Sequence, residues 1–289
     1  MTIKKAVITA AGLGTRVLPA TKSMPKEMLP IVDKPAIQYI VEECVRAGIT
    51  QILIILSRGK HVVEDHFDRS PDLERNLMQN GKTELLNDMI SIADMADITY
   101  VRQQEQLGLG HAVLCAKSFV GNEPFAVLYG DDVIIGEDPA IAQLCRAYDE
   151  FGKGVVGINE VSHEDIQKYS SMKVKHLHDS LFEISDMIEK PLPEQVFSLY
   201  SILGRCILPP EIFEIIENTP PGRNNELQLT DAMKKLSNNV GMIGVDFTGE
   251  RFDMGNKLGI LKASITVGLS HPEIADGLKK FILETAEKL

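Results

Sequence analysis

The stretch Ala6-Val7-Ile8-Thr9-Ala10-Ala11-Gly12-Leu13-Gly14-Thr15-Arg16 decides the fold, because an apolar run leads directly into a loop with two glycines. The apolar and β-branched run 6–9 is typical of a strand buried on both faces of a parallel sheet. Glycines directly after such a strand let the backbone approach a phosphate group and point N–H groups at it. The sequence therefore predicts a phosphate-binding loop at the end of the first strand.

The spacing in this loop excludes two well-known phosphate-binding motifs. A P-loop requires GxxxxGK[ST], which the sequence lacks, and a dinucleotide fingerprint requires glycine where Val17 stands. A long helix cannot follow the loop, because Pro19, Pro25 and Pro30 interrupt the next residues. We therefore expect an extended loop across the carboxyl ends of the strands, where open α/β sheets bind ligands.

Strand and helix signals alternate outward from this loop. Apolar runs predict strands at 52–56, 98–101 and 125–129. Apolar residues at helical spacing predict helices at 36–47, 111–116 and 140–151. After Gly154 strands become denser, at 155–161, 172–178, 181–188 and 201–208. Helices return at 211–218, 229–237, 257–269 and 272–288. The alternation predicts an α/β fold with a mainly parallel sheet and helices on both faces.

The composition fits one acidic globular domain. The chain has 289 residues, a net charge of −11 and 44% hydrophobic residues, which allows a sizeable core. We find no linker or repeat and interpret the polar stretch 68–87 as a surface excursion, so we expect a single domain over 1–289. Because an acidic surface repels nucleic-acid backbones, we expect no nucleic-acid partner, although one pocket can still be locally basic.

The cysteines and the beginning of the chain both predict a cytoplasmic protein. The cysteines lie far apart and form no CxxC pair, which argues against zinc and redox motifs; they are Cys44, Cys115, Cys145 and Cys206. The first apolar run is too short for a membrane span and lacks a signal-peptide cleavage pattern. Reduced thiols without an export signal indicate the cytoplasm and no membrane partner.

Three cations lie in the same loop as the two glycines: Arg16, Lys22 and Lys26. Cations and glycines together suit a triphosphate, whose charge is spread over several oxygens. The alternative is a solvated basic loop, since loops are normally polar and exposed.

Residues 10–16 followed by Pro25-Lys26-Glu27-Met28-Leu29-Pro30 resemble the signature of the sugar-1-phosphate nucleotidylyltransferases. Further family segments match in order along nearly the whole chain: Gln103 with Leu107–Ala112, Gly130–Asp132, Glu189–Pro191, Asn225–Ala232 and Phe252–Gly259. Asn225 takes the family's usual glycine position. The resemblance implies a Rossmann-like three-layer α/β/α nucleotidyltransferase fold with a mostly parallel central mixed sheet. It also implies a nucleotide-binding portion at 1–150, and a sugar-binding portion with C-terminal helices at 151–289.

The resemblance further implies a reaction between UTP and glucose 1-phosphate that gives UDP-glucose and pyrophosphate. A sugar-phosphate oxygen would attack the α-phosphorus in line. Because both reactants are anions, positioned cations and a metal ion would offset their repulsion, and no covalent nucleophile is required. The segments His111-Ala112 and Lys257-Leu258-Gly259 favour the uridylyl branch. The family also implies a homo-oligomer, either a dimer or a tetramer.

By the same resemblance the site residues fall into four groups. The catalytic group is Arg16, Lys26, Asp131 and Lys190. The nucleotide-binding group is Ala10, Ala11, Gly12, Gly14, Thr15, Arg16, Gln103 and Gly108. The sugar-phosphate group is Glu189, Lys190 and Gly204. Mg²⁺ would be held by Asp131 and Asp253, which suits an ion that takes a few carboxylates with phosphate oxygens and water.

Each assignment has a plainer alternative. Asp131 and Asp253 could be turn residues, and Asp132 could act behind the metal ligands. The Gln103 carboxamide matches the N3–H and carbonyl of uracil, but a surface glutamine is the alternative. The pair 189–190 could be an exposed ion pair. The histidines of 176–178 lack a third ligand, which favours an exposed hairpin over a metal site.

Two departures from the family pattern lie on the sugar side: Ser170 where glycine is usual, and Leu199 where asparagine or lysine is usual. They leave the geometry of glucose binding open, but not the nucleotidyl chemistry. Two rival functions also stay open, a sister enzyme with another base or sugar and a non-catalytic regulatory paralogue. The paralogue is disfavoured because the charged residues are retained: Arg16, Lys26, Asp131, Lys190 and Asp253.

Overall fold

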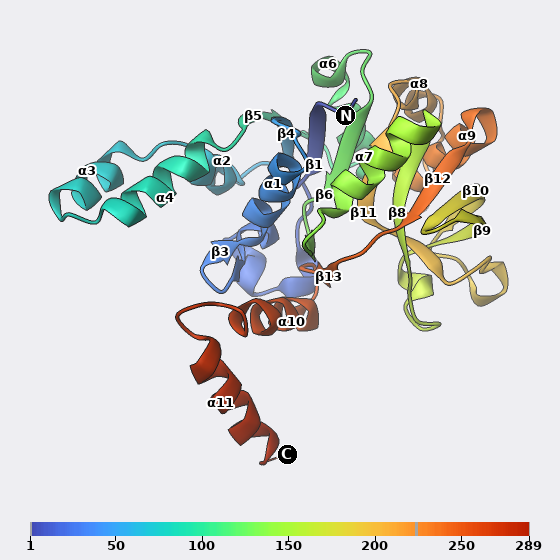
Figure 1. Cartoon of the computed structure of the whole chain (residues 1–289). Coiled ribbons are helices and arrows are strands. Elements are labelled where there is room, and N and C mark those ends of the chain that lie inside the picture. The colour runs from blue at the N-terminus through green and yellow to red at the C-terminus, as the bar shows by residue number, and fades with distance from the viewer. Residues whose placement is uncertain (1, 223–224, 289) are drawn as a thin grey trace.

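The computed structural model describes residues 2–222 and 225–288 and is built around a nine-stranded sheet (Figure 1). From edge to edge its strands are β5 (Asp97–Arg102), β4 (Gln51–Leu56), β1 (Lys5–Thr9), β6 (Phe125–Tyr129), β11 (Tyr200–Leu208), β8 (Gly154–Glu160), β12 (Met242–Asp246), β10 (Leu181–Glu189) and β9 (Ser170–His178). Strands β11 and β10 are antiparallel to their neighbours, and the other seven strands run in the same direction. The predicted mostly parallel mixed sheet is confirmed.

Helices cover both faces of the sheet, so the fold has three layers (Figure 1). One layer contains α1 (Ala36–Arg46) and α7 (Ala140–Phe151), and the other contains α5 (Leu109–Leu114), α8 (Ile212–Glu217) and α9 (Leu229–Val240). Successive residues of a strand point to opposite faces, so Ala6 and Ile8 of β1 join the first layer, whereas Val7 joins the second. The expected α/β/α arrangement is confirmed.

Strand β12 lies outside the predicted strands, and the sequence shows why. Gly241 and Gly244 interrupt its apolar pattern, although Met242, Ile243 and Val245 are buried. It pairs in parallel with β8 and in antiparallel with β10. The sheet therefore continues without a break from the first half of the chain into the second.

The polar stretch 68–87 does lie at the surface, but it is helical. It forms α3 (Pro71–Gln79) and the beginning of α4 (Thr83–Asp94), which project together as an arm in Figure 1. Helix α2 (His61–Phe67) joins this arm to β4. Pro71 begins α3 at a position where its missing N–H group costs no hydrogen bond.

The remaining elements are short, except at the C-terminus. Strand β7 (Asp132–Ile135) pairs with β13 (Glu250–Asp253), and β2 (Pro30–Ile31) pairs with β3 (Lys34–Pro35). Helix α6 (Lys117–Val120) is a single turn, and the 3₁₀ helices are η1 (Thr15–Val17), η2 (Ala20–Lys22), η3 (Lys26–Met28), η4 (Ile166–Lys168) and η5 (Pro193–Gln195). Helix α10 (Lys257–Gly268) follows β13. Helix α11 (Ala275–Ala286) extends away from the sheet and buries no residue (Figure 1).

Candidate active site

The loop after β1 turns back on itself through η1, η2 and η3, in agreement with the prediction that no long helix follows. Gly14 adopts a left-handed conformation with φ of 67°, and its carbonyl accepts a hydrogen bond of 2.8 Å from Thr21 Oγ1. A Cβ atom on Gly12 would lie 3.6 Å from Lys26 Nζ. Gly12 therefore lies against the ammonium group of Lys26, and Gly14 lies against the Cβ atom of the same residue.

Two carboxylates from distant parts of the sequence meet beside this loop. Asp131 follows the strand β6 after a single turn residue, Gly130, and the register of β7 with β13 sets Asp132 opposite Asp253. Lys26 Nζ lies 2.5 Å from Asp131 Oδ2. Arg16 reaches both carboxylates, with Nη2 at 3.6 Å from Asp131 Oδ2 and Nη1 at 3.3 Å from Asp253 Oδ2. Four predicted site residues are thus brought together.

The two cations keep Asp131 ionised. Burial works to raise the pKa of Asp131, but Lys26 and Arg16 outweigh burial and hold that pKa below its ordinary value. Burial likewise works to lower the pKa of Lys26, and Asp131 outweighs it, so the pKa of Lys26 is raised. Both groups are therefore charged at neutral pH.

The segment after Asp253 is shaped by its contacts with Arg16. A Cβ atom on Gly255 would collide with the guanidinium of Arg16, and the Gly255 N–H donates to Asp253 Oδ1 at 2.7 Å. Asn256 caps α10, because its side chain accepts a hydrogen bond of 2.7 Å from the Gly259 N–H. The Gly255 N–H therefore holds the Asp253 carboxylate, and Asn256 begins α10 directly after it.

The donor set fits magnesium and no closed metal site. Within residues 2–222 and 225–288 there is no group of three or more His, Cys, Asp or Glu side chains that could hold a metal ion. Mg²⁺ is usually bound by one or two carboxylates together with substrate phosphates and water. Asp131 and Asp253 could supply two such carboxylates. Lys26 pairs with Oδ2 of Asp131, and Arg16 pairs with Oδ2 of both aspartates.

Two adjoining cavities open beside the carboxylates. The smaller, of about 330 Å³, is lined by residues that include Gly12, Lys26, Gln103 and Gly108. The larger, of about 560 Å³, is lined by residues that include Ser170, Glu189, Lys190 and Asp253. Both are lined by Leu109, Tyr129 and Asp131. Asp131 therefore stands where a molecule in one cavity would meet a molecule in the other.

Gln103 and Gly108 lie together in the smaller cavity. Gln103 Nε2 donates to the carbonyl of Gly108 at 3.2 Å and lies 3.0 Å from His111 Nδ1. Gly108 has φ of 101°, and a Cβ atom there would lie 2.8 Å from the Leu227 carbonyl, so only glycine fits. The carboxamide oxygen of Gln103 accepts no hydrogen bond from the described residues, and it is thus available to an N–H donor of a base.

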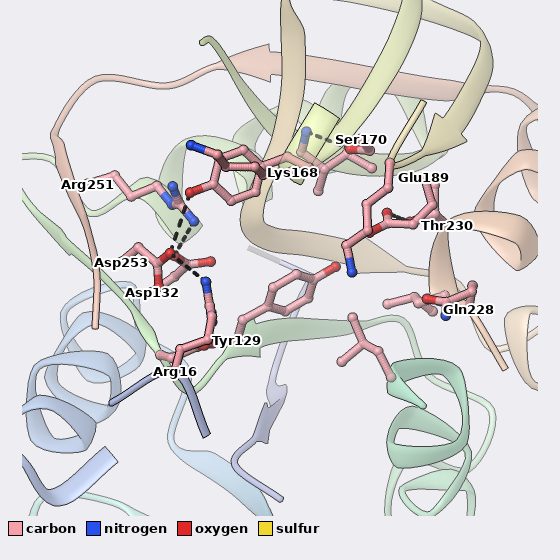
Figure 2. Close-up of a pocket in the computed structure, with 16 residues that line it drawn as sticks. Arg16, Tyr129, Asp132, Lys168, Ser170, Glu189, Gln228, Thr230, Arg251 and Asp253 are labelled. Carbon is pink, nitrogen blue, oxygen red and sulfur yellow. Dashed lines mark hydrogen bonds and ion pairs between the residues drawn. The ribbon is translucent and has the colours of Figure 1, made fainter. Parts of the chain in front are cut away.

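Glu189 and Lys190 both line the larger cavity, although neighbouring residues of a strand normally point to opposite faces. The cause is the left-handed conformation of Lys190, with φ of 46°, which ends β10. The Lys190 N–H donates to the Tyr169 carbonyl at 2.7 Å. Glu189 Oε2 accepts a hydrogen bond of 2.8 Å from Thr230 Oγ1, as Figure 2 shows.

Opposite Glu189, an ion pair between Arg251 and Asp132 lines the larger cavity (Figure 2). The sequence singles out Asp132, but it gives no signal for Arg251. Arg251 Nη2 lies 2.5 Å from Asp132 Oδ1, and its guanidinium lies 5.0 Å from the ring centroid of Tyr169. The Tyr169 hydroxyl donates to Asp253 Oδ2 at 3.4 Å. Asp132 is buried, and burial raises its pKa to about 6. Asp132 thus positions Arg251 beside the predicted metal ligands.

Gly204 lies against the buried carboxylate of Asp132. It has φ of 73°, and a Cβ atom at this position would collide with the Asp132 side chain. The glycine therefore makes room for Asp132, and its contact with a sugar phosphate stays a prediction.

The two departures from the family pattern differ in their positions. Ser170 lines the larger cavity, its Oγ accepts from the Ile202 N–H at 3.1 Å, and its N–H donates to Ser201 Oγ at 3.2 Å. Leu199 is half-buried, and its carbonyl accepts from the Val161 N–H at 3.0 Å. Ser170 is therefore the departure that bears directly on the site.

The other predicted loop residues are held by side chains that the sequence does not single out. The Ala10 carbonyl accepts a hydrogen bond of 2.5 Å from Lys60 Nζ, and the Ala11 carbonyl accepts one of 2.9 Å from Gln106 Nε2. Thr15 begins η1. These contacts attach the loop to the segments that follow β4 and β5.

No helix in the described part of the chain is both long enough and apolar enough to cross a membrane.

A glycine loop beside two cations, paired carboxylates and two joined cavities make up the candidate site, and comparison with known proteins shows the family of the chain. The chain belongs to the nucleotidyl transferase family, whose sequence model matches residues 5–268.

Three similar proteins carry the same activity in their names. The chain is 50% identical over 286 residues to the UTP–glucose-1-phosphate uridylyltransferase YngB of Bacillus subtilis, which covers 99% of this chain and 96% of the relative. A UTP-bound enzyme of the same kind from Acinetobacter baumannii superimposes with a TM-score of 0.90 at 39% identity, covering 98% of this chain and 99% of the other. A UDP-glucose pyrophosphorylase complexed with UDP-glucose superimposes with a TM-score of 0.85 at 41% identity, covering 93% and 100%.

Proposed function

We propose that this protein is a uridylyltransferase that forms UDP-glucose and pyrophosphate from UTP and glucose 1-phosphate. The observation that carries the proposal is the junction of two cavities at Asp131, with Asp253 and two cations around it. Two anionic substrates meeting there would react beside positive charge. The names of the relatives, at about half identity, supply the substrates.

The side chains around the junction have distinct tasks in this reaction. Lys26 and Arg16 would neutralise the triphosphate, and Lys190 would hold the phosphate of the sugar. Mg²⁺, held by Asp131 and Asp253, would supply further positive charge at the reacting phosphate oxygens. Burial raises the pKa of Tyr129 well above its ordinary value, so the phenol between the cavities stays protonated and is no nucleophile. Direct attack by the sugar phosphate is thus favoured.

Selection of uracil would fall to Gln103 and the backbone of Gly108. The free carboxamide oxygen can accept from the N3–H of uracil, a donor that cytosine lacks. Thymine differs from uracil only by a methyl group, which is worth about 1–3 kcal/mol in a pocket. Among the alternative nucleotides, dTTP should therefore be the one that the enzyme discriminates against least.

A pyrophosphate-release assay across four nucleotides and several sugar 1-phosphates tests the proposal. UTP with glucose 1-phosphate should give the highest kcat/KM. Equal or better turnover with dTTP would point to the sister enzyme, and no turnover with any pair would favour the regulatory paralogue.

Replacement of Lys190 by alanine should lower kcat/KM for glucose 1-phosphate at least about tenfold, while UTP binding stays nearly unchanged. A charge-assisted contact is worth about 1.5–3 kcal/mol, and Lys190 lines only the larger cavity, which this proposal assigns to the sugar phosphate. Steady-state kinetics and calorimetry with UTP alone measure the two effects separately.

Glu189→Ala is the matched control for Lys190, because the neighbouring side chain lines the same cavity. It should reduce discrimination among sugars and also spare UTP. Weakened UTP binding with normal sugar kinetics in Lys190→Ala would mean that the two cavities are assigned the wrong way round.

We also propose that the C-terminal helices join two copies of the chain. On and after α10, Leu258, Leu261, Ile265 and Leu269 are 43–61% exposed and follow the spacing of a helix–helix seam. Phe281 of α11 is 64% exposed. A fully exposed side chain of this size has an area of roughly 200 Å². On that basis these residues, together with Ile274 and Leu283, expose on the order of 700 Å². Each partner of a stable dimer buries a similar area, roughly 800 Å². Helix α11 buries no residue, and a helix of this length is only marginally stable in water without a packing partner.

The double variant Leu261→Glu/Phe281→Glu should halve the size of the assembly in sedimentation velocity, from dimer to monomer or from tetramer to dimer. Leu85→Glu on α4 is the control, since Leu85 is 50% exposed on the arm. A wild-type monomer at micromolar concentration, or an unchanged mass of the double variant, would contradict this surface.

We further propose that the chain folds as a single domain and that it works in a reducing compartment. The sheet draws strands from both 1–150 and 151–289, which supports one domain with a nucleotide side and a sugar side. The four cysteines are free and three of them are buried, which suits a cytoplasmic enzyme.

A further inference from the structure

Glu27, which follows the catalytic candidate Lys26, is completely buried. Its Oε2 accepts a hydrogen bond of 2.8 Å from Lys60 Nζ. Its Oε1 is also buried, and it has no hydrogen-bond partner among the described residues. A carboxylate inside the core with one unpaired oxygen is costly, so stability alone gives no reason for it.

Lys60 connects the two ends of the phosphate-binding loop. The residue is 7% exposed and stands just before α2, beyond the end of β4. Its ammonium donates to Glu27 and, at 2.5 Å, to the carbonyl of Ala10 where β1 ends. The first residue of the loop and the η3 turn are therefore held by one side chain.

The η3 turn directs two neighbouring side chains to different places. Lys26 points to Asp131, with Nζ at 2.5 Å from Oδ2, whereas Glu27 points to Lys60 in the core. Because the two residues are adjacent, a shift of Glu27 moves the Lys26 backbone with it.

We propose that the buried Glu27–Lys60 pair is a positioning device that sets Lys26 and the loop for the nucleotide phosphates. Neither residue lines the two cavities, so both act through Lys26 and Ala10. A buried ion pair is often no more stabilising than well-packed apolar residues of similar volume. Its use here is to fix one geometry of the loop, because a charged pair tolerates fewer arrangements than an apolar one.

The inference rests on the proposed nucleotide site, and three variants test it with readouts besides activity. Glu27→Gln keeps the shape but removes one charge, and Lys60→Met removes the other. Glu27→Leu/Lys60→Met replaces the pair by apolar groups. The single variants should lower the melting temperature, and the double variant should recover most of it. UTP affinity by calorimetry should fall at least tenfold in all three.

Hydrogen exchange of residues 10–28 gives a second measurement that needs no nucleotide. Exchange should be faster in the double variant than in the wild type, even though its melting temperature has recovered. Glu42→Gln is the matched control, because Glu42 pairs with Lys34 at 2.8 Å near the protein surface and outside the cavities. It should leave UTP affinity and loop exchange unchanged.

Full recovery of UTP affinity and loop exchange in the double variant would overturn the inference and leave the pair a purely structural role. Wild-type affinity and wild-type exchange in both single variants would overturn it as well. If the wild type bound no nucleotide, the proposed function would fail. The exchange of residues 10–28 would still decide whether the pair orders the loop.

Discussion

Replacing Asp131 by asparagine should lower kcat on the order of 10²–10³-fold and leave the fold intact. The amide keeps the shape of the side chain but removes the charge that faces Lys26 at 2.5 Å and Arg16 at 3.6 Å. It also removes one of two carboxylates that fit Mg²⁺, so charge that develops in the transition state loses its stabilisation. Pyrophosphate release with saturating Mg²⁺ measures kcat, and circular dichroism checks the fold.

Asp253→Asn should have a similar effect, because Asp253 lies 3.3 Å from the same guanidinium. Asp138→Asn is the matched control, since Asp138 pairs with Arg146 at 2.5 Å on the surface. Chelation of Mg²⁺ should abolish turnover of the wild type. A near-wild-type kcat in Asp131→Asn would remove Asp131 from the reacting centre.

Replacing Arg205 by methionine should destabilise the protein by about 3–5 kcal/mol, because it leaves a buried carboxylate without its partner. Arg205 is fully buried, and its Nη2 lies 2.6 Å from Oε2 of Glu43, which is 3% exposed. Arg205 Nε also donates to both oxygens of Glu43, at 3.1 and 3.2 Å. Equilibrium unfolding in urea measures the change in the free energy of unfolding.

Two comparisons make this stability result specific. Glu43→Leu/Arg205→Met should recover much of the loss, because neither charge is then left alone in the core. Lys117→Met breaks the exposed Lys117–Glu217 pair of 2.6 Å and should cost less than about 1 kcal/mol. A loss below about 1 kcal/mol in Arg205→Met would show that Glu43 is solvated or neutral in the variant.

The parts of the site that depend on the local backbone are predicted well from sequence. Gly14 and Gly108 have positive φ, and Gly108 and Gly255 also lie too close to other groups for a Cβ atom. A glycine in a motif indicates such a backbone requirement, because other residues would be strained or would collide there. The strand before the loop is predicted for a similar reason, because residues buried on both faces must all be apolar.

The parts that depend on tertiary partners could not be predicted in this way. Lys60 meets a carboxylate 33 residues away, and Arg251 pairs with Asp132 across two short strands. Nothing in the residues beside Lys60 marks it as a partner of Glu27. Arg251 directly precedes the segment Phe252–Gly259, but nothing in that segment indicates a pair with Asp132. The helical arm is likewise hard to predict, because it has little core of its own: Leu77 and Leu86 are the only buried residues within α3 and α4.

The open sheet has a consequence for behaviour in a crowded cell. Its outermost strands, β5 and β9, each leave a row of backbone groups without a neighbouring strand, and such rows can pair with other chains and start aggregates. Strand β9 carries the exposed lysines Lys173 and Lys175, and β5 begins with Asp97 and ends with Arg102. A second chain that approached either edge would have to desolvate these charges. The charges on the two edge strands therefore disfavour self-assembly of the enzyme into fibres.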